Sequence, residues 1–336
     1  MLFDMRFTLI ICTYKRAQPL LKLLHSVCSQ TLYPTEILII DGSVDNETQF
    51  MLSENVFQNL TYFKVDAKDR GLTKQRNYGL ARVGEASEVV CFLDDDTVLA
   101  PTYFEEIVKT YQEYPAALGV GGYITNEAQW YKVTSDSVPK INEFFYDGWK
   151  RKDGSRFVWR KKLGLDSNRA PGCLPEFSHG RSIGFLPPSG KIYEVEQLMG
   201  GVSSFRTSIF KDFQFSTFFE GYGLYEDADF TLRLSKAGKL YVNTNAQLEH
   251  HHDASGRPNQ YEYGKMVVRN GWYVWRVKHP NPSFEAKFKW HVITLLLAAI
   301  RGVNVITTSK RKEAATELLG RLVGWISLFF NSPRNQ

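Results

Sequence analysis

The stretch Val89-Val90-Cys91-Phe92-Leu93-Asp94-Asp95-Asp96 joins an uninterrupted apolar run to three consecutive carboxylates. A continuous apolar run is typical of a parallel strand that is covered by helices on both faces. Three carboxylates at one strand end repel one another, and a hard divalent cation with oxygen ligands relieves that repulsion. A polar strand end that caps the following helix is the alternative, and this motif by itself does not separate the two.

Two apolar runs upstream also end in polar residues. Residues 7–12 run into Thr13-Tyr14-Lys15-Arg16, and residues 36–40 run into Asp41-Gly42-Ser43. Helical patterns occupy 19–28, 73–83 and a segment that begins near residue 101, and a weaker strand pattern occupies 61–65. This alternation predicts an α/β fold with a doubly wound parallel sheet. Ligands bind beyond the carboxyl ends of such strands, so the three polar ends together mark a candidate site.

Length and composition limit the class of protein. The 336 residues predict one large α/β domain or two smaller ones, at about 150 residues per domain. Hydrophobic residues make up 43% and charged residues 23%, which excludes a disordered chain and a small disulfide scaffold. The net charge of +5 is weaker than the basic stripe of a nucleic-acid-binding domain, so we expect no nucleic acid partner. A mildly basic protein suits anionic substrates and membrane surfaces.

The sequence predicts a cytoplasmic protein. Cys12, Cys28, Cys91 and Cys173 form no CxxC pair, so we expect reduced core thiols. The N-terminal residues run directly into a strand pattern without the shape of a signal peptide. The longest apolar run near the C-terminus, residues 290–300, is shorter than the about 20 residues that span a bilayer.

The C-terminal part looks helical from about residue 261, with an interruption at Pro280-Asn281-Pro282. Its apolar stretches, 290–300 and 322–330, are flanked by basic residues. Two interpretations stay open. The helices pack on the catalytic domain or on a second subunit of a homo-oligomer, or they form an interfacial surface that docks on anionic lipid at the inner face of the membrane.

Two further polar motifs are candidates for chemistry. Glu226-Asp227-Ala228-Asp229 opens a helix pattern, where acidic residues are favoured by the helix dipole or where one carboxylate serves as a general base. His250-His251-His252 follows a strand-like segment at 239–242. The triplet is either a run of solvated loop histidines or the source of one imidazole that joins carboxylates around a cation. The sequence does not say which of the three histidines that is.

Two glycine-containing segments complete the set. Residues 71–79 carry Arg76, which meets a nucleotide base or phosphate or is simply a solvated helix residue. The pair Gly200-Gly201 permits close approach of the backbone to a ligand, or forms an ordinary turn.

Together these motifs resemble the family 2 glycosyltransferases, which are inverting enzymes of GT-A fold. The resemblance runs from about Phe7 to about Lys278 and rests on 12–16, 41–45, 71–79, 93–96, 200–201, 226–227 with Arg233, and His250. It implies a Rossmann-like, mainly parallel sheet flanked by helices. Residues 1–125 would bind the nucleotide sugar, 126–260 would bind the acceptor and complete catalysis within the same domain, and 261–336 would form a helical C-terminal extension.

The resemblance also implies an activity. The enzyme would move a sugar from a nucleotide-diphosphate donor to a hydroxyl of a glycan or lipid-linked acceptor, in surface polysaccharide or glycolipid assembly. A nucleotidyltransferase would need a glycine-rich phosphate loop after the first strand, and residues 12–16 contain no glycine. An inactive carbohydrate- or nucleotide-binding module is opposed by the intact set of carboxylates.

Roles follow from the resemblance position by position. The nucleotide-sugar site would contain Thr13, Tyr14, Arg16, Asp41, Arg76, Asp94 and Asp95. Asp96 and His250 would hold Mn²⁺ or Mg²⁺, Gly200 and Gly201 would border the acceptor, and Asp227 would be the catalytic base with Glu226 beside it. The chain departs from the family at Ile40, where many members carry a polar residue, so Asp41 is the only acidic candidate at that strand end.

Overall fold

A computed structural model describes residues 5–134, 138–219, 221–252 and 258–333. The chain divides into two compact units, each built from two separate stretches. Unit 1 contains residues 1–127 and 188–257, and unit 2 contains residues 128–187 and 258–336. The three consecutive segments expected from the sequence differ from this division, because residues 128–187 group with the C-terminal helices.

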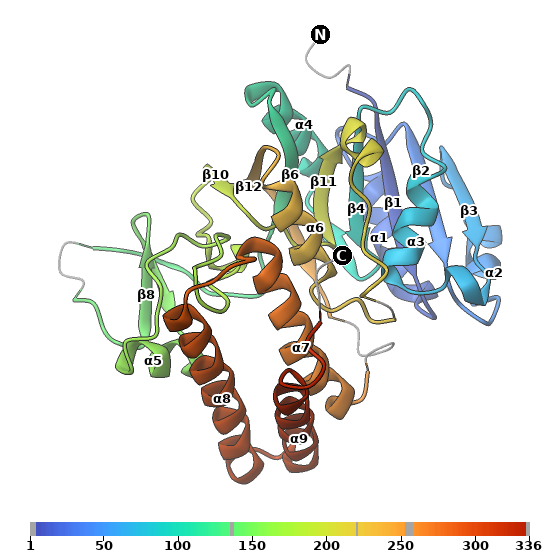
Figure 1. Cartoon of the computed structure of the whole chain (residues 1–336). Coiled ribbons are helices and arrows are strands. Elements are labelled where there is room, and N and C mark those ends of the chain that lie inside the picture. Colours follow the sequence, from blue (N-terminus) through green and yellow to red (C-terminus); the bar gives the residue numbers. More distant parts are fainter. Residues whose placement is uncertain (1–4, 135–137, 220, 253–257, 334–336) are drawn as a thin grey trace. The chain divides into compact units, whose positions relative to one another are not determined.

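Unit 1 follows the predicted alternation of strands and helices (Figure 1). Its first stretch contains β1 (Phe7–Thr13), α1 (Ala17–Cys28), β2 (Glu36–Asp41), α2 (Glu47–Glu54), β3 (Leu60–Lys64), η1 (Ala67–Asp69), α3 (Leu72–Leu80), β4 (Val89–Asp94), β5 (Thr97–Leu99), α4 (Tyr103–Glu113) and β6 (Ala117–Ile124). Its second stretch contains β10 (Ile192–Val195), β11 (Val202–Arg206), η3 (Thr207–Lys211), α6 (Glu226–Leu234) and β12 (Lys239–His250).

Within the described residues, unit 1 holds a nine-stranded mixed sheet in the order β10-β12-β6-β11-β4-β1-β2-β3, with β5 paired to β12. The strands β4, β1, β2 and β3 are mutually parallel, and β12 is parallel to β6. Strand β11 runs antiparallel between β4 and β6. The parallel strands therefore end at one edge, where the polar residues that follow β1, β2 and β4 lie.

Alternating side chains of the strands bury both faces of this sheet. Phe7, Leu9 and Ile11 of β1 pack with the buried faces of α1 and α4 in one core cluster. On the opposite face, a Cβ at Gly79 of α3 would lie 2.9 Å from Ile10, so the missing side chain lets α3 approach β1 closely. These contacts explain the uninterrupted apolar runs, and the predicted fold class is confirmed.

Unit 2 combines a small sheet with three long helices. It contains β7 (Tyr131–Lys132), β8 (Glu143–Tyr146), β9 (Trp149–Lys152), α5 (Ser155–Lys162), η2 (Ile183–Phe185), α7 (Gln260–Lys278), α8 (Phe284–Thr307) and α9 (Arg311–Ser327). The predicted break at Pro280–Pro282 separates α7 from α8, and α8 begins where the Ser283 side chain accepts a hydrogen bond from the backbone N–H of Ala286. The predicted helical extension is present.

Helix α8 corrects the expected length of the apolar segment. It has 24 residues and continues through Arg301, so it extends well beyond residues 290–300. By length and composition it could cross a membrane. Only 17% of its most apolar window is buried, so it is not an ordinary core helix. The prediction that no segment reaches spanning length is therefore wrong.

The prediction of core thiols is also wrong for Cys28, which is exposed, whereas Cys91 is buried.

Candidate active site

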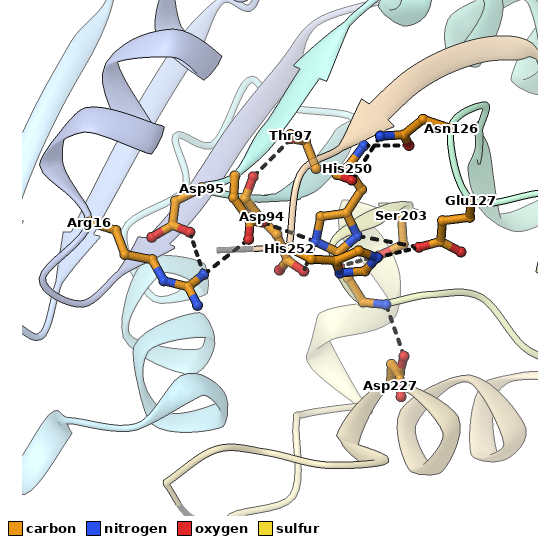
Figure 2. Close-up of polar contacts among 12 residues, drawn as sticks. Arg16, Asp94, Asp95, Thr97, Asn126, Glu127, Ser203, Asp227, His250 and His252 are labelled. Carbon is orange, nitrogen blue, oxygen red and sulfur yellow. Dashed lines mark hydrogen bonds and ion pairs between the residues drawn. The ribbon is translucent and has the colours of Figure 1, made fainter. Parts of the chain in front are cut away.

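The carboxylates of residues 94–96 bind different partners at the end of β4. Asp95 is buried, and it accepts hydrogen bonds from the Thr13 hydroxyl at 2.7 Å and from Nη1 of Arg16 at 3.1 Å. The same guanidinium nitrogen lies 3.3 Å from Oδ2 of Asp96. The side chains of Thr13 and Arg16 thus tie the loop after β1 to the acidic triplet. Figure 2 shows the contact of Arg16 with Asp95.

Burial dominates the protonation of Asp95. It raises the pKa of this carboxyl to about 7, although the charge of Arg16 and the hydrogen bonds from Thr13 and Arg16 oppose the rise. Asp94, by contrast, keeps a side chain that is 37% exposed. Asp95 and Asp96 are thus both buried, whereas Asp94 is partly exposed, and Asp94 and Asp96 are the two carboxyls that face His250.

His250 lies opposite these two carboxylates. It is the last residue of β12, which runs much further than the expected strand at 239–242. Its Nε2 lies 3.0 Å from Oδ1 of Asp96 and 4.0 Å from Oδ2 of Asp94. Burial lowers the pKa of this imidazole, but the hydrogen bond to Asp96 and the nearby carboxylate charges outweigh burial and leave the pKa above its usual value.

The three neighbouring histidines point to different partners. His250 faces Asp96, whereas Nε2 of His252 lies 2.9 Å from Oε1 of Glu127. The exposed His251 ring pairs with Glu249 at 3.3 Å. Of the three candidates that the sequence left open, His250 is the one whose ring reaches the acidic triplet.

The donor set at this position fits a divalent cation. Asp94, Asp96 and His250 each offer a ligand atom, and these atoms lie within 4.8 Å of one another. Carboxylate oxygens suit Mg²⁺ and Mn²⁺, and an imidazole is acceptable to Mn²⁺. Glu127, His250 and His252 form a second group of the same spacing, so His250 stands between the two groups.

Asn126 and Glu127 belong to this site although the sequence analysis did not single them out. The Asn126 side chain donates to the backbone carbonyl of His250 and accepts from its N–H, both at 3.0 Å. Oε1 of Glu127 lies 3.8 Å from Nδ1 of His250. Both residues follow β6, so a further polar strand end was the signal that could have revealed them.

The second acidic cluster opens helix α6. Oδ2 of Asp227 accepts a hydrogen bond from the backbone N–H of Gly200 at 3.1 Å, and Oδ1 accepts from the N–H of Ala228 at 2.7 Å. Figure 2 shows Asp227 on this helix. Burial raises the pKa of Asp227 above the ordinary aspartate value, and the two backbone hydrogen bonds oppose that rise. The residue that precedes the helix, Tyr225, has a left-handed backbone with φ of 70°.

Glu226 and Arg76 form a buried ion pair. The Arg76 guanidinium is 3% exposed, contacts the Glu226 carboxylate and lies 3.8 Å from Oδ1 of Asp94. Burial raises the pKa of Glu226 to about 8, and Arg76 opposes this rise. Arg76 therefore lies beneath both acidic clusters and connects them, and it is not a solvated helix residue.

Gly200 and Gly201 fill the space between the clusters. A Cβ on Gly200 would lie 2.5 Å from Oε1 of Glu226, and a Cβ on Gly201 would overlap the Asp94 carboxylate. The backbone N–H of Asp94 also donates to the carbonyl of Gly201 at 3.1 Å. These positions need glycine because acidic side chains occupy the volume of a side chain.

Two expected nucleoside contacts occupy different environments. Asp41 is fully buried, and it accepts hydrogen bonds from the Ser43 N–H at 2.7 Å and the Tyr62 hydroxyl at 2.8 Å. Tyr14 is 37% exposed and so is open to a ligand. In this conformation Asp41 organises the loop after β2, and Tyr14 presents a ring to solvent.

The comparison with protein families identifies the region that contains most of this site. Residues 8–170 match the family described as Glycosyl transferase family 2. This region, slightly less than half of the chain, matches the family that the motifs resemble. The resemblance inferred from the motifs is thereby confirmed.

Curated relatives of this region are named as enzymes that transfer sugars. It is 31% identical over 146 residues to a glucosyl-dolichyl phosphate glucuronosyltransferase of Haloferax volcanii, covering 42% of each chain. It is 33% identical over 96 residues to the O-antigen chain rhamnosyltransferase RfbN of Salmonella typhimurium, covering 29% of this chain and 30% of the relative. The matching stretches thus span less than half the length of either relative.

Solved structures support the fold over most of the chain. TarS of S. aureus, residues 1–349, superposes with a TM-score of 0.51 and 16% identity, over 96% of this chain and 80% of that one. GalNAc-T7, solved with UDP, GalNAc and Mn²⁺, gives a TM-score of 0.52 and 15% identity, over 81% of this chain and 49% of that one. At these identities the likeness establishes the GT-A fold.

Proposed function

We propose that this protein is an inverting, cation-dependent glycosyltransferase. It moves a sugar from a nucleotide-diphosphate donor to a hydroxyl of a glycan or a lipid-linked acceptor, in surface polysaccharide or glycolipid assembly. The relatives named for glucuronosyl and rhamnosyl transfer support this class of reaction. Neither the donor sugar nor its nucleotide is specified by the residues of the site.

One observation carries the proposal. Two acidic clusters that are more than 120 residues apart in the sequence meet around Gly200 and Gly201, with the buried Arg76 touching Glu226 and lying near Asp94. One cluster offers the ligand set for a cation, and the other offers a carboxylate at the start of α6. A transferase for sugar nucleotides needs both functions within one site.

Asp227 is the proposed catalytic base. Backbone N–H groups hold both of its oxygens, which fixes the direction of the carboxylate. The acceptor oxygen forms a bond to the anomeric carbon as the bond from that carbon to the diphosphate breaks. The hydroxyl proton passes to Asp227, and the nucleoside diphosphate leaves with the electron pair. Attack from the face opposite the diphosphate inverts the anomeric configuration.

Asp94, Asp96 and His250 are the proposed residues for holding Mn²⁺ or Mg²⁺. When bound, the cation supplies charge neutralisation for the diphosphate leaving group. The protein prepares this position with the Arg16 contact to Asp96 and with the Asn126 clamp on the His250 backbone. Both contacts orient the ligand side chains before any substrate arrives.

The proposed nucleotide-sugar site lies beyond the ends of β1, β2 and β4. Tyr14 is its exposed aromatic ring, and Asp94 would meet the ribose or the sugar. Thr13, Arg16 and Asp95 would shape the site through the hydrogen bonds they make with one another. Asp41 and Arg76 would act from beneath the surface, because both are buried.

Gly200 and Gly201 would border the acceptor, and the buried Glu226 would fix the helix start beside it. We place the reaction in the cytoplasm, on the inner face of the membrane, where a lipid-linked acceptor would be available.

The test is release of free nucleoside diphosphate from a panel of UDP-, GDP- and dTDP-sugars, with water or simple glycans as acceptors. Asp227→Asn should lower turnover by about 10²–10⁴-fold while donor affinity stays near that of the wild type. The matched control is Asp212→Asn, because Asp212 is an exposed aspartate outside the site.

The products separate the competing functions. A nucleotidyltransferase would release no nucleoside diphosphate from these donors, but it would release pyrophosphate from a nucleoside triphosphate and a sugar phosphate. An inactive binding module would bind a nucleotide without releasing any product. Full turnover in Asp227→Asn would exclude this aspartate as the base even if the enzyme class is right.

A further inference from the structure

Helix α8 carries a continuous apolar face that the rest of unit 2 leaves open. Its exposed large apolar side chains, here called the α8 stripe, are Phe284, Phe288, Leu295, Val303 and Ile306. At 100° per residue these positions fall on one side of the helix. Phe284 is 84% and Ile306 is 75% exposed, so the stripe reaches both ends of a helix about 36 Å long.

The opposite side of α8 is the packed side. Trp290 and Ile293 are buried there, and Trp290 meets the ring of Trp272 on α7 at a centroid distance of 4.8 Å. Arg301 lies 2.6 Å from Glu317 of α9, and Lys289, near the other end of the helix, lies 2.6 Å from Glu285 of α8 itself. The stripe is therefore not the face by which α8 joins its neighbours.

Helix α9 adds exposed apolar side chains to the same unit. Leu319 is 54% and Ile326 is 50% exposed, and Phe330 just beyond the helix is 86% exposed. The packed side of α9 lies against α7, where a Cβ on Gly320 or Gly264 would overlap the backbone of the partner helix. Helices α8 and α9 lie side by side, joined by a short turn (Figure 1).

The charges around this surface have one dominant sign. Residues 283–333 contain seven Lys and Arg but three Glu. Three of the cations, Lys310, Arg311 and Lys312, are consecutive where α8 turns into α9, and the Lys310 side chain is 74% exposed. Lys287 and Lys289 flank the other end of the stripe. An apolar face bordered by cations is the pattern of a helix that lies at an anionic membrane interface.

We propose that the α8 stripe, with the exposed apolar side chains of α9, docks flat on an anionic lipid bilayer. The apolar side chains enter the boundary between headgroups and acyl chains, and Lys310, Arg311 and Lys312 meet anionic headgroups. A second copy of the chain fits this surface less well, because residues 283–333 offer no acidic cluster to match the basic turn.

The packed side also explains why α8 lies on the bilayer and does not cross it. Crossing would bring the Arg301–Glu317–Arg321 ion pairs into hydrocarbon or would separate α8 from α9. Lying flat leaves these ion pairs and the Trp290 contacts in place. The docking surface does not depend on which sugar the enzyme transfers, so it stands or falls separately from the catalytic proposal.

The experiment is flotation of the full chain with phosphatidylcholine vesicles, with and without phosphatidylglycerol, at low and high salt. The wild type should float with the anionic vesicles at low salt. Its binding to neutral vesicles, and to anionic vesicles at high salt, should be at least about tenfold weaker than this. Phe288→Ser with Ile306→Ser, and separately Lys310→Glu with Lys312→Glu, should each weaken flotation by at least about tenfold.

Val56→Ser with Val138→Ser is the matched control, because these valines are 98% and 73% exposed elsewhere on the chain. Its flotation should equal that of the wild type. Melting temperatures show whether each variant folds. If Phe288→Ser with Ile306→Ser fails to fold, Lys310→Glu with Lys312→Glu still tests the proposal, because it leaves the apolar side chains in place.

Three results would overturn the proposal. Wild-type protein that stays in the soluble fraction with anionic vesicles has no such docking surface. Protein that resists extraction by alkaline carbonate spans the membrane. The third result is a wild-type protein that binds no vesicles but forms a dimer in light scattering. If Phe288→Ser with Ile306→Ser dissociates that dimer, the stripe binds a second copy of the chain.

Discussion

Glu127 connects two histidines at the side of the cation site away from Arg16. Its Oε1 lies 2.9 Å from Nε2 of His252, where it accepts a hydrogen bond when that nitrogen carries a proton, and 3.8 Å from Nδ1 of His250. His250 turns its other nitrogen to Asp96. Carboxylates in this relation fix the orientation of a metal-ligating imidazole and raise its basicity.

Glu127→Ala should therefore weaken Mn²⁺-dependent binding of a nucleoside diphosphate by about 10–100-fold. Calorimetry with and without Mn²⁺ measures this change, and Glu127→Gln should recover part of the affinity because an amide can still contact the ring. Glu249→Ala is the control, since Glu249 pairs with the outward-facing His251. Equal affinities for Glu127→Ala and the control would show that Glu127 does not position the ligand.

The protonation of Asp227 should set the acid limb of the pH–rate profile. A base must be unprotonated, and burial raises the pKa of Asp227, so kcat/KM should fall as pH decreases through a value above the ordinary aspartate pKa of about 3.9. Glu226 is adjacent and also has a raised pKa, so the limb reports the pair. An acid limb at the ordinary aspartate value would contradict the raised pKa of Asp227.

Arg76 and Glu226 join two elements, α3 and α6, through a buried ion pair. Arg76→Met would leave a buried carboxylate without its partner and should lower the free energy of unfolding by about 3–5 kcal/mol. Denaturant titration measures the loss. The double variant Arg76→Met with Glu226→Leu should regain most of it, and a double variant as unstable as the single one would show that the pair is not the cause.

The sequence predicted the elements whose apolar runs are unbroken. It missed β6, because Gly119, Gly121 and Gly122 dilute the pattern. Those glycines exist because Phe205, Leu198 and Tyr103 fill the places where their side chains would lie. Packing between distant residues removed the local signal, and with it the clue to Asn126 and Glu127 beyond the strand.

Two other elements were longer than their patterns indicated. Strand β12 continues past an irregular register between Val242 and Gln247, which carries His250 to the end of a strand and not to a loop. Helix α8 continues through Arg301 because arginine is a good helix former, and its charge interrupts only the apolar run. In this helix the apolar run therefore ended before the element did.

The acidic residues of the site were predictable because parallel strands bring their carboxyl ends to one edge. The burial of Arg76 and Asp41 was not, since neither helix periodicity nor a turn signal reports which partner a charged side chain meets. Their roles in binding, like that of Asp227 in catalysis, stay predictions.

At the scale of the whole molecule, the candidate catalytic residues all lie in unit 1, whereas the α8 stripe lies in unit 2. Nucleoside diphosphate with Mn²⁺ should therefore slow amide hydrogen exchange at the end of β4, the start of α6 and the end of β12. Peptides from α8 and α9 should exchange at unchanged rates, while anionic vesicles should protect those helices. Protection of α8 by the nucleotide would contradict this separation of functions.

The central claim is that Asp96 and His250 share one cation beside Asp227. Anomalous diffraction at the manganese edge, from crystals grown with Mn²⁺ and a nucleoside diphosphate, tests it most directly. The account predicts a peak in direct coordination to Asp96 and His250, with the diphosphate between that peak and Asp227. A manganese peak elsewhere in the molecule, or nucleotide bound at this edge of the sheet without manganese, would contradict it.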